Sequence, residues 1–138
     1  MKVLTSDWNS SKDQLSFVRR QVFIVEQGID PKDEWDHLDQ EAVHFVSFGT
    51  TAVPTGTCRL TDNGQIARLA VLPAYRHQGY GEMLLNRAIK VAREMGIRKV
   101  FLHAQIDVQT FYEKQHFNSD GKVFLEAGKM HIRMERDI

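Results

Sequence analysis

An arginine and two glycines stand close together in the middle of the chain, in the string "VLPAYRHQGYGEMLLNRA". Arg76 precedes Gly79 and Gly81, and the apolar residues that follow recur at three- and four-residue spacing, as on one face of an amphipathic helix. The first turn of a helix has N–H groups without intrahelical partners, and glycine lets an anion come close to the backbone. The string therefore predicts a phosphate-binding loop, with a plain turn at a helix start as the alternative.

Two other phosphate-binding patterns fit this string poorly. A P-loop needs Lys followed by Ser or Thr after its second glycine, whereas Glu82 and Met83 follow Gly81 here. A dinucleotide-binding fingerprint needs a third glycine three residues further on, where Leu84 stands. The spacing of one arginine and two glycines is the pattern that remains.

A second string, "HAQIDVQTFYEKQHF" from His103 to Phe117, places a phenol close to the end of a predicted strand. Tyr112 falls in the first turn or two of a short helix that follows this strand. A thioester cofactor has to release its sulfur as a thiol, and a phenol is a plausible proton donor for that step. Tyr112 is therefore a candidate catalytic residue.

The elements that must position these residues form a β-α-β unit, with a strand at 66–72, a helix from Gly79 to Gly96, and a strand at 98–104. Before this unit we expect a strand at 2–5 and a helix capped by Ser10 or Ser11, followed by two strand-like runs that form an antiparallel meander with the 66–72 strand. After it come a short helix and a closing hairpin. The predicted fold class is α/β (α+β), with a mixed, mostly antiparallel sheet of about seven strands, helices on both faces and one parallel pair.

Composition narrows the function classes. The 138 residues suit a single domain over 1–138, and a net charge of zero argues against nucleic acid as the partner. No stretch is long and apolar enough for a membrane span, and Cys58 is the only cysteine, so we expect no membrane association and a cytoplasmic location. The run from Gly28 to Glu41 holds six acids and one lysine. We interpret it as a solvated acidic face and predict no metal site.

The two strings together, Arg76-x-x-Gly79-x-Gly81 and Phe111-Tyr112-Glu113-Lys114-x-x-Phe117, resemble the GNAT superfamily of acyl-CoA N-acyltransferases. The resemblance covers the chain from about Ile66 to Phe117. The string "VRRQVFIVEQ" and the pattern Gly128-x-x-His131-x-x-Met134 are similar to small bacterial members whose substrate is uncharacterised. His116 departs from the family pattern, because a glycine is usual there.

This resemblance implies acetyl-CoA as cosubstrate, bound between two splayed parallel strands. One strand would bind the pantetheine through its backbone, the glycine loop would bind the pyrophosphate, and Gln105 would stand where many members have an asparagine that contacts the cofactor. The implied cofactor-binding residues are Leu69, Ala70, Val71, Arg76, His77, Gln78, Gly79, Tyr80, Gly81, Gln105, Phe111, Tyr112 and Lys114.

The implied reaction is acetyl transfer to a primary amine of a small molecule or peptide, by direct attack in a ternary complex. Tyr112 would protonate the leaving sulfur, and Glu26, paired with His131, would take the proton of the amine. Because the 28–41 run is acidic, a cationic acceptor such as a polyamine or a lysyl amine is favoured. A non-catalytic acyl-CoA-binding module is the alternative function, and a homodimer is one option for the assembly.

Overall fold

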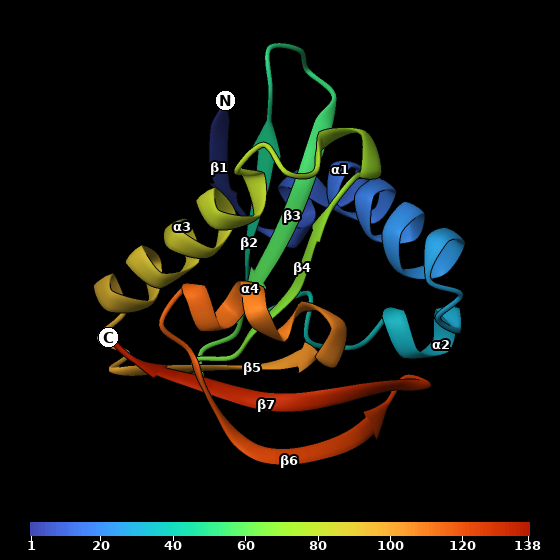
Figure 1. The fold of residues 1–138 in the computed structure, drawn as a ribbon. Coiled ribbons are helices and arrows are strands. Elements are labelled where there is room, and N and C mark those ends of the chain that lie inside the picture. Colours follow the sequence, from blue (N-terminus) through green and yellow to red (C-terminus); the bar gives the residue numbers. More distant parts are fainter.

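Two antiparallel sheets meet at one edge in the computed structural model, which describes residues 1–138 (Figure 1). The first sheet has the order β1-β2-β3-β4, with β1 at Lys2–Ser6, β2 at Val43–Phe48, β3 at Pro54–Leu60 and β4 at Ile66–Val71. The second has the order β5-β7-β6, with β5 at Lys99–Gln105, β6 at Asn118–Glu126 and β7 at Lys129–Asp137. The seven predicted strands and the fold class are confirmed.

The predicted parallel pairing between 66–72 and 98–104 is present as a single bridge. Gln65 pairs with Phe101 in parallel, and the amide of Phe101 donates to the carbonyl of Gly64 at 3.0 Å. Beyond this bridge β4 pairs only with β3, and β5 pairs only with β7. The facing edges of β4 and β5 therefore form no further ladder with each other. Two open strand edges therefore face each other.

Helices cover both faces of the first sheet. Helix α1 spans Trp8–Arg19 and continues as the π-helix η1, Arg20–Glu26. The predicted cap at Ser10 or Ser11 is wrong, because the Asp7 carboxylate accepts from the amide of Ser10 at 2.8 Å and the helix begins earlier. On the other face lies α3, Tyr80–Glu94, while α4, Gln109–Lys114, packs against β5 of the second sheet (Figure 1). The short elements are α2, Pro31–Glu34, and the 3₁₀ turns η2, Pro73–Tyr75, and η3, Ile106–Val108.

The main core lies between α3, α4 and the two sheets. Its fully buried members include Phe45, Leu60, Leu84, Val100 and Met134. Met95, which the periodicity places on the buried face of α3, is instead 44% exposed near the helix end. Cys58 is buried in this core, and burial raises the pKa of its thiol to about 12, so the thiol stays protonated. No helix of the structure is long and apolar enough to cross a membrane.

Strand β4 contains a bulge that the sequence did not reveal. Thr57 pairs with Ala70 and Arg59 pairs with Ala67, so β4 holds one residue more than β3 over the same length. Arg68 takes a left-handed φ of 54° there, which a non-glycine residue adopts rarely. The bulge interrupts the ladder between β3 and β4 at Arg68 and Leu69.

Candidate active site

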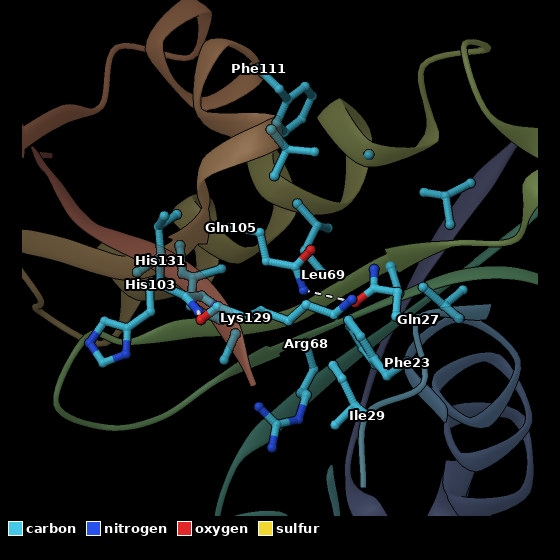
Figure 2. Close-up of a pocket in the computed structure, with 18 of the residues that line it drawn as sticks. Phe23, Gln27, Ile29, Arg68, Leu69, His103, Gln105, Phe111, Lys129 and His131 are labelled. Carbon is cyan, nitrogen blue, oxygen red and sulfur yellow. Dashed lines mark hydrogen bonds between the residues drawn. The ribbon is translucent and has the colours of Figure 1, made fainter. Parts of the chain in front are cut away.

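A cleft of about 1210 Å³ lies between the diverging edges of β4 and β5. We call one part of it the glycine end, which is lined by Val71, Gly79, Gly81, Phe111 and Tyr112. The other part, the hairpin end, is lined by Gln27, His103, Glu126, Lys129 and His131. Figure 2 shows the hairpin end, where the strands of the second sheet face the end of η1 and Ile29. Residues that are far apart in the sequence thus share one cavity.

The glycine end presents backbone N–H groups rather than side chains. Gly79 takes a φ of 94° at the N-cap of α3, and no side chain caps this helix. The amides of Tyr80, Gly81 and Glu82 have no backbone acceptor, because the first bond of α3 is the one from Met83 to Gly79. A Cβ at Gly81 would lie 3.5 Å from Cζ of Phe111, so this position is closely lined on one side. These features suit an anion at the start of α3.

Arg76 ties the glycine loop to η1. Its Nε donates to the carbonyl of Val71 at 2.9 Å, while Nη1 and Nη2 donate to the two carboxylate oxygens of Glu26 at 2.7 and 2.6 Å. These hydrogen bonds lower the pKa of Glu26, which therefore stays ionised and is a weakened base. The predicted pairing of Glu26 with His131 is wrong, because Glu26 binds Arg76, whereas His131 lies beside the Lys129 carbonyl and Glu126.

Tyr112 lines the glycine end from α4. Its ring packs edge-on against Phe111 and Phe117, with centroids 5.1 and 6.0 Å away, and the side chain is buried. Burial raises the pKa of the phenol well above its usual value. The hydroxyl is therefore protonated at neutral pH, so this group can donate a proton to something bound in the cleft.

The carboxylate of Glu126 lies near two histidines at the hairpin end, His103 and His131. The Nδ1 atom of His131 lies 2.8 Å from the carbonyl of Lys129, which only accepts, so Nδ1 carries the hydrogen. In the neutral ring Nε2 is then free to accept a proton, and it lies 3.9 Å from Oε2 of Glu126. His103 holds the other oxygen of Glu126 at 3.0 Å from its Nδ1 and thereby lowers the pKa of this carboxyl group.

Gln105 bridges the two sides of the cleft. Its Nε2 donates to Oε1 of Gln27, the residue that follows η1, at 2.8 Å (Figure 2). Leu69, Ala70, His77, Tyr80 and the other predicted site residues also line the cleft, with two exceptions. Gln78 and Lys114 are exposed outside its lining, and the Gln78 amide bonds the Ala74 carbonyl at 3.3 Å.

Three arginines and three acids form an ion-pair network beneath the hairpin end: Arg19, Arg59, Arg68, Glu34, Asp36 and Asp39. Arg19 is 1% exposed and binds Glu34 and Asp39 at 2.7 Å each. Arg59 of β3 binds Asp36 and Asp39. Arg68 of β4 binds Glu34 and Asp36. The expected solvated acidic face is therefore wrong for these acids, because arginines from distant elements neutralise them.

Several residues of the hairpin end and of the network beneath it were not predicted, because no neighbouring residues in the sequence indicate their role. Arg19, Arg59 and Arg68 stand in three separate elements and read as ordinary basic residues. Glu126 and His103 likewise belong to different strands, and only the register of the second sheet brings them together. The alternation of polar and apolar residues along β5 is the one feature that places His103 and Gln105 on a common face.

Comparison with known proteins agrees with this geometry. A model of the acetyltransferase (GNAT) family matches residues 9–117. The chain is 33% identical over 124 residues to the uncharacterized N-acetyltransferase YjcF of Bacillus subtilis, covering 88% of this chain and 89% of the relative. The fold is similar to that of an acyl-CoA N-acyltransferase from Pseudomonas aeruginosa, with a TM-score of 0.84, 28% identity and 99% of each chain covered.

A third similar structure is that of an aminoglycoside 6'-N-acetyltransferase complexed with coenzyme A. Its TM-score is 0.74, with 99% of this chain and 97% of that chain covered, and its 17% identity shows a common fold alone. The family match spans most of the sequence and includes both the glycine loop and Tyr112. The chain therefore belongs to the acetyltransferase (GNAT) family.

Proposed function

We propose that this protein transfers the acetyl group of acetyl-CoA to a primary amine, by direct attack in a ternary complex. The observation that carries the proposal is the combination, in one cleft, of an uncapped helix start, an open strand edge and a buried phenol. In a member of the acetyltransferase family, these three features fit a pyrophosphate, a pantetheine arm and a departing thiolate, respectively.

The residues present fit acetyl-CoA. The free amides from Gln78 to Gly81 would hold the pyrophosphate, and the backbone of Leu69, Ala70 and Val71 would bond the pantetheine as an added strand. Arg76 would add positive charge from its position between Val71 and Glu26. A backbone amide near Val71 would stabilise the oxyanion that forms on the thioester carbonyl. Bound in this way, acetyl-CoA supplies an activated acyl group.

The protein's own residues manage two protons. A primary amine with a pKa of ~10 is mostly protonated at neutral pH, so its proton must leave before attack. His131 would accept this proton at Nε2, and Glu126 would stabilise the resulting imidazolium. As the new N–C bond forms and the C–S bond breaks, Tyr112 would donate its proton to the sulfur. Glu26 stays the second candidate base, disfavoured by its two bonds to Arg76.

Two measurements test this function. A shift of melting temperature with acetyl-CoA or CoA, but not with ATP or NAD, is expected because only a ligand that prefers the folded state stabilises it. Consumption of acetyl-CoA in the presence of a panel of amines, aminosugars and peptides then separates an enzyme from a binding module. Stabilisation by acetyl-CoA without turnover of any amine would make the protein a non-catalytic acyl-CoA binder.

A further inference from the structure

Two opposite charges face each other across the β6–β7 turn without forming an ion pair. Glu126 and Lys129 are register partners, separated by Ala127 and Gly128, which both take a left-handed φ, of 50° and 74°. Such a two-residue turn holds the flanking side chains on the same face of the hairpin, with Cβ atoms about 5 Å apart. Glu126 nevertheless bonds His103, and the ammonium of Lys129 has neither a salt bridge nor a hydrogen bond.

Lys129 points into the cleft. Figure 2 shows its side chain extended from the hairpin toward Gln27, across the space between the two sides of the hairpin end. The residue is partly buried and lines the cavity. An ammonium group that is partly removed from water and unpaired gains free energy from any anion bound beside it.

The other lysine and arginine side chains that line the cleft each have a carboxylate partner. Arg68 binds Glu34 and Asp36 at 3.0 and 3.2 Å, and Arg59 binds Asp36 at 2.8 Å. Arg76 is paired with Glu26 at the glycine end. Among the lysine and arginine side chains that line the cleft, Lys129 is thus the one without a carboxylate partner.

We propose that the acceptor amine also carries an anionic group, a carboxylate or a phosphate, and that Lys129 binds this group while the amine lies beside His131. This inference rests on the proposed acetyl transfer. Lys129 and His131 are two residues apart on one face of β7, so their Cα atoms lie roughly 6–7 Å apart. A short spacer between amine and anion, as in small amino acids or aminoalkyl phosphates, fits that separation.

Matched acceptor pairs test the inference on the intact protein. We expect kcat/KM for γ-aminobutyrate to exceed that for butylamine, and that for phosphoethanolamine to exceed that for ethanolamine, by about tenfold or more, as for one charge-assisted contact. The larger of the two ratios tells a carboxylate from a phosphate site. Lys129→Met should abolish the preference by raising KM for the anionic member alone, and Lys129→Arg should keep part of it.

Lys122→Met is the control, because Lys122 is an exposed lysine on the same hairpin outside the cleft. Equal kcat/KM within both pairs in the wild type, or a preference that survives in Lys129→Met, would overturn the inference. If acetyl-CoA binds but no amine reacts, the proposed function fails, and calorimetric titration with N-acetyl-γ-aminobutyrate and N-butylacetamide decides the inference separately. Tighter binding of the anionic compound that Lys129→Met removes supports it, and equal binding, or none by either, refutes it.

Discussion

The two ends of the cleft are built on different principles. The glycine end presents backbone amides at the start of α3 beside the edge of β4, and the few consecutive residues from Leu69 to Gly81 determine both. The hairpin end uses side chains from η1, β5, β6 and β7, brought together only by the sheet register. The difference teaches that a backbone site can be read locally, whereas a side-chain site depends on long-range pairing.

Among the substitutions proposed here, one in the ion-pair network beneath the hairpin end should lower the free energy of unfolding most. Arg19→Met would remove one arginine partner from each of the buried acids Glu34 and Asp39, so we expect a loss of about 3–5 kcal/mol in the free energy of unfolding. Urea denaturation measures this loss. Arg20→Met, one residue further on and exposed, should change it by less than about 0.5 kcal/mol. Equal effects of the two substitutions would contradict the network's role.

The two candidate bases lie at different ends of the cleft, so the activities of their variants tell which end holds the base. His131→Asn should lower turnover about 100-fold or more, with a deficit that shrinks as pH rises and free amine accumulates. Glu26→Gln should have a smaller effect, because Arg76 already occupies both oxygens of this carboxylate. Rate–pH profiles of both variants provide the measurement. A larger, pH-dependent deficit in Glu26→Gln would move the base to the glycine end.

A substitution at Gly81 tests whether a phosphate of CoA comes close to the backbone at the start of α3. Gly81→Val adds a branched side chain beside Phe111, where phosphate is expected to meet the helix start, and should weaken CoA binding about 10- to 100-fold. Gly81→Ala is the matched control, since its Cβ would make an ordinary contact at 3.5 Å from Phe111. Calorimetry and a melting curve separate binding from folding. Unchanged CoA affinity in Gly81→Val would refute this assignment of the loop.

A smaller effect concerns the pH dependence of stability. His44 is buried, its Nε2 donates to the Asp39 carbonyl at 2.9 Å, and burial lowers the pKa of the imidazole below its usual value of ~6.5. The folded state therefore binds the proton less well than the unfolded state does. This contribution to stability is complete above pH ~6.5 and is lost as pH falls toward the folded pKa.

His44→Gln should flatten the decline of the unfolding free energy between pH 7 and 5, by at most about 1.4 kcal/mol per pH unit. His37→Gln, at an exposed histidine of the neighbouring loop, should leave the slope as it is. Denaturation at several pH values compares the slopes. A slope in His44→Gln equal to that of the wild type would show that other groups cause the acid sensitivity.

The sequence predicted the elements and the glycine end because periodicity, glycine spacing and the Tyr112 string are local signals. His116, which stands at a position usual for glycine, keeps the turn by taking a left-handed φ of 68°. The burial of Glu34 and the β4 bulge were not predicted, and the predicted partner of His131 was wrong. Each depends on a strand or helix distant in sequence, so that no neighbouring residue reveals whether an acid is solvated or paired with an arginine.

The most direct test of the proposed chemistry is turnover in Tyr112→Phe. Phenylalanine keeps the ring packed against Phe111 and Phe117 but removes the proton for the leaving sulfur, so melting temperature and CoA affinity should barely change. Acetyl transfer should fall about 100-fold, the low end of acid catalysis, because a thiol with a pKa near ~8.5 is already a tolerable leaving group. Tyr75→Phe, at a second tyrosine of the cleft, should stay close to wild type. Full activity of Tyr112→Phe with a true acceptor at every pH would contradict the account and leave Tyr112 as a packing residue.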